Sequence, residues 1–319
     1  TLFARTVSTR PLLSARISDE DDARLALTNR QAAILDMLRR QRRVMIAGGA
    51  GTGKTLIARE KAIRLASEGM RTLLLCYNRG LADHLREQCA GIEGLDVATF
   101  HQVCHRWIDR VKAKRARDLL TEARADLPGG DEFDHHMPMA LAVAVDALGP
   151  IYDAIVVDEA QDFGDEYWLP VEMLLTRPDK AMLYVFLDEN QDIYHRSANI
   201  PVTGEPMVLD RNCRNTDAIH AAAYSHYRGA AVEPPEIAGI GVERLFASDI
   251  EKQARSIGSL VTKLVADENV APHEIAILLC DASDRPARER ALQKLPLPAI
   301  VRLGRVEDFG PGGLTVDTV

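Results

Sequence analysis

The chain has 319 residues, of which 46% are hydrophobic and 27% are charged, and its formal net charge is -8. A usual domain size of roughly 100 to 200 residues predicts two domains, and this ordinary composition excludes collagen-like and wholly disordered chains. No apolar run reaches the ~18 residues of a membrane helix. With 47 acidic against 39 basic residues, the surface as a whole cannot be a phosphate binder. The five cysteines contain no CxxC pair, which favours a reducing, cytoplasmic compartment over a disulfide scaffold.

The two ends of the sequence suggest a piece of a longer protein. Residue 1 is Thr rather than Met, and the last residues, 314–319, lie inside an expected strand. Residues 1–16 carry three arginines and no acidic residue, so a transit peptide is one interpretation. A linker or remnant of an upstream domain over residues 1–25 is the preferred one.

Hydrophobic periodicity in the first two thirds of the chain predicts an α/β fold with a parallel sheet. Short apolar runs alternate with helical patterns, an order that favours parallel strands joined by crossover helices. A helical pattern includes Ile34, Leu35 and Leu38, and a longer one follows Lys54 and closes at Gly69. The expected strands are residues 43–47, 71–76, 154–157 and 182–187.

The segment with Pro201, Gly204 and Pro206 predicts a crossing between two lobes. Beyond it the sequence predicts a second α/β series, with no internal repeat. The expected elements are helices at residues 217–227 and 249–266 and strands at residues 274–279 and 314–319. The predicted domains are therefore a first lobe at residues 26–205 and a second, truncated lobe at residues 206–319.

The sequence GGAGTGKT at residues 48–55 fits the phosphate-loop pattern GxxxxGK[ST] between a predicted strand and a predicted helix. Glycines let backbone N–H groups turn toward a phosphate, and the N-terminus of the following helix favours the same anion. The lysine is expected to reach the β- and γ-phosphates of ATP, and the threonine hydroxyl to bind Mg²⁺. The expected nucleotide-binding residues of this loop are Gly48, Gly49, Ala50, Gly51, Thr52, Gly53, Lys54 and Thr55.

Two adjacent carboxylates, Asp158 and Glu159, follow the apolar strand expected at residues 154–157. The carboxyl ends of the strands are where open parallel sheets bind ligands. We expect Asp158 to bind the metal, and Glu159 to orient and deprotonate the attacking water. With the phosphate loop upstream, the pair predicts a site of nucleotide hydrolysis.

The order of four segments resembles the UvrD/Rep-like branch of superfamily 1 DNA helicases. These segments are the phosphate loop, DEAQD at 158–162, LDENQDIY at 187–194 and LDRNCRN at 209–215. Within that branch the chain looks most like the helicases with an N-terminal nuclease-related (NERD) domain, and the match runs from about residue 27 to the end. The resemblance implies two RecA-like P-loop NTPase lobes, the second incomplete, with ATP and Mg as cofactors and single-stranded DNA as partner.

The resemblance also implies roles for single residues. Gln31 matches a glutamine that reads adenine, Gln191 one that senses the γ-phosphate and couples it to DNA, and Arg214 an arginine finger that reaches across from the second lobe. In relatives, two further motifs lie along the single-stranded DNA. The implied nucleic-acid residues are Tyr77, Asn78, Arg79, Thr99, Phe100, His101 and Tyr194.

The sequence also departs from this family. Leu187 replaces a glycine, Arg196 stands where close relatives place a base-stacking tryptophan, and Cys213 replaces the tyrosine that stacks on adenine. The spacings leave no room for the large inserted subdomain of UvrD-type enzymes. We therefore expect two bare lobes with small excursions, one of them at residues 128–138.

Three weaker patterns have alternative interpretations. The basic run at residues 106–117 fits either a solvated helix face or phosphate contacts. A zinc site built from Cys89, His101, Cys104 and His105 is disfavoured, because structural zinc ligands usually come in closely spaced pairs. The loop around His135 and His136 reads as acidic and solvated, and Trp107 and Trp168 as packing residues.

Taken together, the sequence predicts an ATP-dependent DNA helicase or translocase module that couples Mg-ATP hydrolysis to single-stranded DNA binding. One alternative is a DNA-dependent ATPase switch that grips nucleic acid or signals to a partner without unwinding. A second alternative is a non-enzymatic remnant, which the presence of Lys54, Asp158 and Glu159 disfavours.

Overall fold

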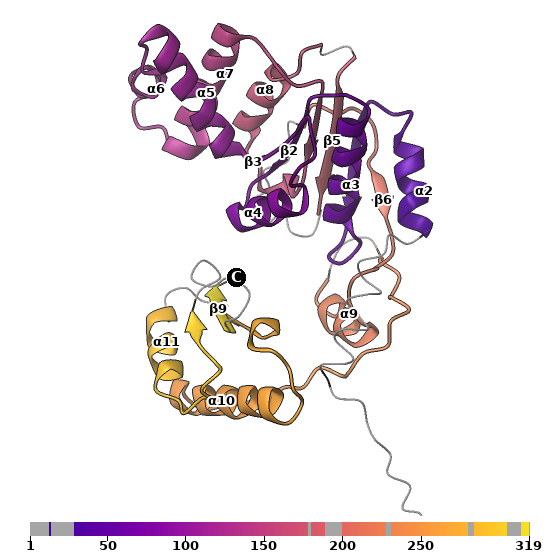
Figure 1. The fold of residues 1–319 in the computed structure, drawn as a ribbon, viewed down its shortest axis with the longest axis vertical. Helices are drawn as coiled ribbons and strands as arrows, with labels where there is room; N and C mark the ends of the chain where they lie inside the picture. Colours follow the sequence, from indigo (N-terminus) through magenta and orange to yellow (C-terminus); the bar gives the residue numbers. More distant parts are fainter. Residues whose placement is uncertain are drawn as a thin grey trace, which may run out of the picture. The chain divides into compact units, whose positions relative to one another are not determined.

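The computed structural model describes residues 13, 29–177, 180–188, 200–227, 231–279, 284–304 and 314–318 (Figure 1). The chain divides into two compact units. One is Leu27–Ile240, and the other joins Thr1–Ala26 to Gly241–Val319.

The larger unit is built on a parallel sheet of six strands, in the order β3-β2-β4-β5-β1-β6. Its four central strands are short apolar runs that are almost wholly buried, as expected of a parallel sheet with both faces covered. The α/β class with parallel strands is confirmed. The strands are β1 (Arg43–Gly48), β2 (Thr72–Cys76), β3 (Leu95–Thr99), β4 (Ala154–Val157), β5 (Met182–Leu187) and β6 (Met207–Leu209).

The side chains of each strand alternate between two cores, one on each face of the sheet. In β4, Ile155 and Val157 join one buried cluster, while Ala154 and Val156 join the other. The first cluster lies under α5 (Phe100–Arg115), α7 (Met137–Leu148) and α8 (Asp165–Met173). The second lies under α2 (Asn29–Leu38), α3 (Lys54–Ser67) and α4 (Arg79–Gln88). The remaining elements of this unit are α6 (Leu119–Asp126), the π-helix η1 (Glu132–His136), the short η2 (Ala160–Asp162) and α9 (Asp217–Tyr224).

The segment between α5 and β4 contains more helix than the sequence indicated. The pattern rich in glycine and proline at residues 128–138 read as a loop, yet η1 and the start of α7 lie within it. Pro138 is compatible with helix because it stands in the first turn of α7, where its missing N–H is not needed. Trp107 and Trp168 are each 2% exposed, so their interpretation as packing residues is confirmed.

Residues 206–240, which the sequence pattern assigned to the second lobe, belong by contact to the larger unit. The physical reason is that β6 pairs in parallel with β1, with Ile46 opposite Met207 and Gly48 opposite Leu209. Met207–Leu209 is too short to give a strand signal of its own. The crossing predicted near residue 205 is therefore a return of the chain to the first sheet.

The smaller unit contains a parallel sheet of three strands, in the order β7-β9-β8. Its core is small, with Ala254, Val261, Leu279 and Leu292 as its buried cluster. Among the described residues, no helix has the length and apolar character needed to cross a membrane. The elements are α10 (Ile250–Ala266), η3 (Pro272–Glu274), β7 (Ala276–Leu279), α11 (Arg285–Gln293), β8 (Leu303–Gly304) and β9 (Leu314–Thr318).

Candidate nucleotide and nucleic-acid site

The phosphate loop joins the carboxyl end of β1 to the N-terminus of α3, as its sequence predicted. Gly51 and Gly53 have φ values of 83° and 88°, a left-handed conformation that residues with a Cβ rarely adopt. Gly53 is also the N-cap of α3, so the loop turns directly into a helix whose first N–H groups are unpaired within the helix. The loop can therefore present backbone donors and a positive helix end to an anion.

Neighbouring side chains pack closely against the glycines of this loop. A Cβ at Gly51 would lie 2.5 Å from Asn212 Oδ1 and 2.6 Å from Asn215 Nδ2. A Cβ at Gly53 would collide with Nε2 of Gln31, which is a buried side chain. The structure thus brings Gln31 to the loop, and its role in reading adenine stays a prediction.

Lys54 is buried at the start of α3 and points back into the loop. Its Nζ donates hydrogen bonds to the backbone oxygens of Gly48, at 2.8 Å, and Gly49, at 3.2 Å. The same atom pairs with Oδ2 of Asp188 at 3.2 Å, and this carboxylate is fully buried just after β5. The positive charge is therefore held inside the loop. Asp188 has no assigned role in the sequence analysis, although its place after an apolar strand could have drawn attention to it.

Asp158 follows β4 and is fully buried. Burial first, and repulsion from Glu159 second, raise the pKa of the Asp158 carboxyl to about 7, while Thr55 and Lys54 lower it. Neither carboxylate oxygen makes a well-formed hydrogen bond among the described residues. A buried carboxylate without a partner, beside a threonine hydroxyl, fits a hard divalent cation such as Mg²⁺, which binds few protein oxygens and keeps several waters.

Glu159 stands next to Asp158 in a strained backbone conformation, with φ at 52°. Its Oε2 accepts a hydrogen bond from Nε2 of Gln161 at 2.6 Å, and Oε1 of Gln161 accepts one from the Asp188 N–H at 3.0 Å. Gln161 therefore links the ends of β4 and β5 and orients the Glu159 carboxylate. Strain of this kind concentrates at functional sites.

The segment after β6 returns to the phosphate loop within the same unit. The Cys213 N–H donates to the Gly51 oxygen at 2.8 Å, and the Tyr224 hydroxyl donates to the Ala50 oxygen at 2.9 Å. Arg214 is exposed next to this contact, and its N–H donates to Asn212 Oδ1. No local pattern marks Tyr224 in the sequence, because this residue lies 174 residues from its partner.

Two predicted residues of the site, Gln191 and Tyr194, lie outside the described residues. Arg196, at the position of the expected tryptophan, does so as well. Their roles stay predictions.

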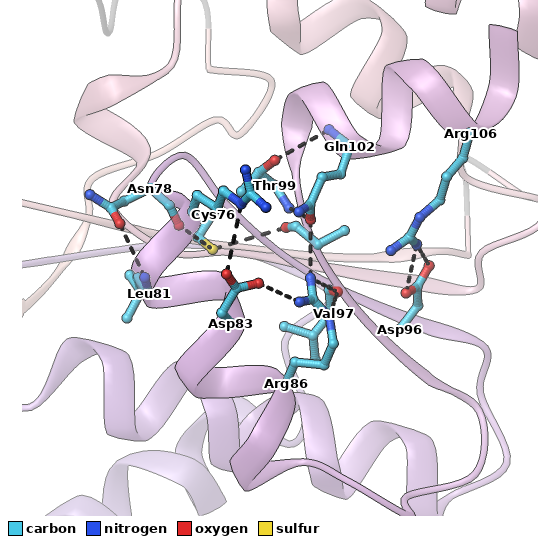
Figure 2. A network of polar contacts seen from close by, with 12 residues as sticks. Cys76, Asn78, Leu81, Asp83, Arg86, Asp96, Val97, Thr99, Gln102 and Arg106 are labelled. Atoms are coloured by element: carbon cyan, nitrogen blue, oxygen red, sulfur yellow. Dashed lines mark hydrogen bonds and ion pairs between the residues drawn. The ribbon is translucent and has the colours of Figure 1, made fainter. Parts of the chain in front are cut away.

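The first predicted nucleic-acid motif lies at the carboxyl end of β2. Tyr77 is half-buried, and Asn78 and Arg79 are exposed. The Asn78 side chain caps α4 by accepting from the Leu81 N–H at 3.1 Å, which Figure 2 shows. The Arg79 side chain is 84% exposed and pairs with Asp83 on the same helix at 3.8 Å. A capped helix end with an exposed arginine suits contact with a phosphate.

The second motif lies at the end of β3, the neighbour of β2, at the start of α5. Thr99 and Gln102 form a capping box, with bonds of 3.2 Å and 3.0 Å between their side chains and each other's backbone N–H (Figure 2). Phe100 is buried, and His101 is half-buried. Burial is the main cause that lowers the pKa of His101. Adjacent strands thus bring the two motifs together.

The basic run on α5 is largely engaged with neighbouring groups. Arg106 contacts both oxygens of Asp96, at 2.9 Å and 2.7 Å (Figure 2), and Lys112 pairs with Asp118 at 3.2 Å. Arg117 pairs with Glu122 at 2.5 Å. These pairs favour the interpretation as a solvated helix face.

The zinc hypothesis finds no support. No group of three or more His, Cys, Asp or Glu residues in the described part of the chain could hold a metal ion. Cys89 and Cys104 are buried free thiols, and burial raises their pKa values.

Glycines and a buried lysine at the carboxyl end of a parallel sheet are the means by which P-loop proteins hold nucleotide phosphates. The fold and this loop define the class as a P-loop nucleotide-binding α/β protein. The chain belongs to the AAA domain family, which matches residues 30–197, more than half of its length. A comparison with curated proteins gives no match.

Three of the solved structures that match this chain have 11–14% sequence identity to it. The NS3-like helicase from Alongshan virus has 11% identity and a TM-score of 0.35, over 86% of this chain and 57% of that one. The Pif1 helicase from Candida albicans has 14% identity and a TM-score of 0.45, over 85% and 55%. A Pif1 helicase described as unwinding forked double-stranded DNA has 12% identity and a TM-score of 0.35, over 82% and 57%. The chain thus spans somewhat more than half of their length.

Proposed function

We propose that this chain is an ATP-dependent DNA helicase or translocase module that couples ATP hydrolysis to binding of single-stranded DNA. The observation that carries the proposal is the group of Lys54, Asp158 and Glu159 at the carboxyl ends of β1 and β4. Lys54 is held in the phosphate loop, and the Asp158 oxygens are buried without a hydrogen-bond partner among the described residues. A buried unpaired carboxylate is costly, so its presence supports a bound cation.

The residues of the site then have distinct roles. The backbone N–H groups of the loop and Lys54 hold the phosphates, and Gln31 contacts the adenine end of the nucleotide. Thr55 and Asp158 hold Mg²⁺, which neutralises charge on the phosphates. Glu159 orients and deprotonates the attacking water, and Gln161 fixes its carboxylate. Gln191 senses the terminal phosphate, and Arg214 stabilises the transferred charge.

Coupling to nucleic acid is supported by the course of the sheet. The two motifs around Tyr77 and His101 follow β2 and β3, and Asp158 follows β4, which is also a neighbour of β2. A movement of Asp158 on metal binding could therefore be transmitted through β4 and β2 to the surface proposed to bind single-stranded DNA. The site would have one state with the γ-phosphate bound and one without it. The affinity for single-stranded DNA would differ between these two states.

The finer family assignment is part of the same proposal. Beyond the AAA domain family, the order of motifs favours the UvrD/Rep-like branch and a nuclease-related domain in the same longer chain. A cytoplasmic location fits the free thiols Cys76, Cys89, Cys104 and Cys213.

The first test is steady-state ATP hydrolysis with and without a single-stranded oligonucleotide. We expect the oligonucleotide to stimulate hydrolysis, and Lys54→Ala to reduce the rate by about 100-fold or more, since it removes a preorganised charge from the phosphate site. Arg64→Ala is the matched control, because Arg64 lies on the same helix and, within the described part of the chain, its ion pair is with Asp36 at the surface. Hydrolysis by Lys54→Ala at the rate of the unmodified protein would refute the proposal.

A strand-displacement assay on the same protein separates the two forms of the proposal. A helicase separates the strands of a partial duplex while it hydrolyses ATP. A DNA-dependent switch hydrolyses ATP with the same dependence on the oligonucleotide but leaves the duplex intact.

A further inference from the structure

Three aromatic rings form a row at the carboxyl ends of β2 and β3. The rings of Tyr77 and His101 meet edge to face at 5.7 Å, and those of His101 and Phe133 do so at 5.2 Å. Tyr77 and His101 are half-buried, whereas Phe133 is 53% exposed. Phe133 comes from η1, a part of the chain to which the resemblance assigns no role.

The row rests on a second layer of rings that is fully buried. Phe100 and Tyr167 are stacked at 4.1 Å with an angle of 3°, and Phe163 packs edge to face against both. Tyr77 also contacts Phe163, at 6.4 Å. Tyr77 and His101 are therefore supported from below, and Phe133 packs against this supported pair through His101.

The backbone around Phe133 is fixed by a network of polar contacts. Oδ1 of Asp131 accepts hydrogen bonds from the N–H groups of Phe133, at 2.8 Å, and Asp134, at 2.9 Å. Oδ1 of Asp134 accepts one from the Tyr167 hydroxyl at 2.8 Å. A large apolar ring is thus held half out of the surface by an ordered π-helix, an element frequent at functional sites.

The charges near Phe133 bear on which ligand could approach it. Asp131, Glu132 and Asp134 are its neighbours, and each has a partner. Asp131 caps η1, Glu132 contacts Arg124 and His136, and Asp134 accepts from Tyr167. This region repels phosphate. Arg79, close to Tyr77 in sequence, is 84% exposed and makes only a long surface pair with Asp83 at 3.8 Å among the described residues, so it remains accessible to a phosphate. A strand would therefore place its backbone toward Arg79 and its bases on the rings.

We propose that Phe133 is a stacking platform for an unpaired nucleobase, the outermost member of the row formed with His101 and Tyr77. Every base has a π-face, so such a platform accepts bases without sequence preference. The inference rests on the proposed function and adds a specific contact to it.

Intrinsic fluorescence gives a direct test. The two native tryptophans, Trp107 and Trp168, are each 2% exposed, so in Phe133→Trp the new indole is the tryptophan that a base can reach. We expect oligothymidine or oligouridine to quench the emission of Phe133→Trp and to leave that of the unmodified protein nearly unchanged. An emission that neither oligonucleotide alters at saturating concentration would overturn the inference.

Affinity measurements by fluorescence anisotropy separate stacking from simple packing. Phe133→Ala and Phe133→Leu are both expected to weaken oligonucleotide binding by roughly 5- to 150-fold, the effect of one lost stacking partner, while Phe133→Tyr keeps it. The unmodified protein and these three variants should bind an abasic oligonucleotide with the same affinity. Full affinity in Phe133→Leu would mean that the ring only packs on His101, and would overturn the inference.

The control variant is Phe246→Ala, because Phe246 is another exposed phenylalanine, at 91%, and lies in the other unit. It should bind the oligonucleotide with unchanged affinity. If the unmodified protein itself binds no oligonucleotide, the proposed function fails. If it binds and Phe133→Ala binds equally, only this inference fails.

Discussion

At the scale of single residues, the site contains buried charged groups whose desolvation opposes folding. Asp158 is buried beside Glu159, and both of its oxygens are without a hydrogen-bond partner among the described residues. In contrast, Lys54 has two backbone oxygens and the Asp188 carboxylate around it. In the absence of a cation, the lysine is therefore held by three partners, whereas burial and Glu159 outweigh Thr55 and Lys54 and raise the pKa of the Asp158 carboxyl.

The first prediction follows from this difference. In buffer with a metal chelator, Asp158→Asn should raise the free energy of unfolding by about 1 to 2 kcal/mol, because it removes a buried charge without a partner. Mg²⁺ with a nucleotide should stabilise the unmodified protein and leave the variant nearly unchanged. Chemical denaturation under both conditions measures this.

Asp146→Asn is the control for this prediction, since Asp146 is exposed on α7 and its change should have little effect. If Asp158→Asn is less stable than the unmodified protein in buffer with a metal chelator, the Asp158 carboxylate is well solvated in the folded state.

The sequence was enough to identify those site residues that belong to a short local motif. The phosphate loop and the pair Asp158 and Glu159 could be found because a strand, a short motif and a helix follow one another in the chain. Tyr224 and Phe133 could not, because their neighbours in space, Ala50 and His101, lie far from them in sequence. Their positions depend on β6 joining the first sheet and on a π-helix in a segment that reads as a loop.

At the scale of elements, α4 and α5 are tied together by one side chain. Arg86 on α4 donates to the Val97 oxygen of β3 at 3.2 Å and to Oε1 of Gln102 on α5 at 3.0 Å (Figure 2). It also pairs with Asp83 at 2.5 Å. Gln102 in turn caps α5 through Thr99. Arg86, in the last turn of α4, therefore ties this helix to the N-terminal end of α5, which is proposed to face the nucleic acid.

The second prediction concerns this link. Arg86→Ala should lower the free energy of unfolding by about 1 to 2 kcal/mol, because it removes two hydrogen bonds to the partly buried Val97 oxygen and one to the Gln102 amide. Arg86→Lys should recover only a part, since an ammonium group cannot contact both acceptors with the same fork. Urea denaturation followed by circular dichroism measures both changes.

Arg106→Ala is the matched control, because Arg106 makes two hydrogen bonds to the Asp96 carboxylate at the surface (Figure 2). Exposed pairs of this kind contribute about 0 to 1 kcal/mol. Equal losses in the two variants would contradict the view that Arg86 is a link between elements.

At the scale of the whole molecule, the two units differ in how much core each one has. The six-stranded sheet of Leu27–Ile240 has a buried cluster on each face, whereas the three-stranded sheet of the other unit has one small cluster. Residues 241–249, which lead from one to the other, are all exposed and form no helix or strand. Composition and motifs predicted two lobes, but such a boundary depends on strand pairing, which the sequence does not reveal.

The last prediction is that limited proteolysis begins in this connection. Trypsin should cleave first after Arg244 and chymotrypsin after Leu245 or Phe246, because exposed backbone without hydrogen-bonded structure fits a protease without local unfolding. Mass spectrometry of the early products locates the cuts. Arg244→Gln should remove the first tryptic cut and leave the chymotryptic one. First cuts within α3 to α5 of the larger unit would mean that the sheet opens more readily than the connection, contrary to its two buried cores.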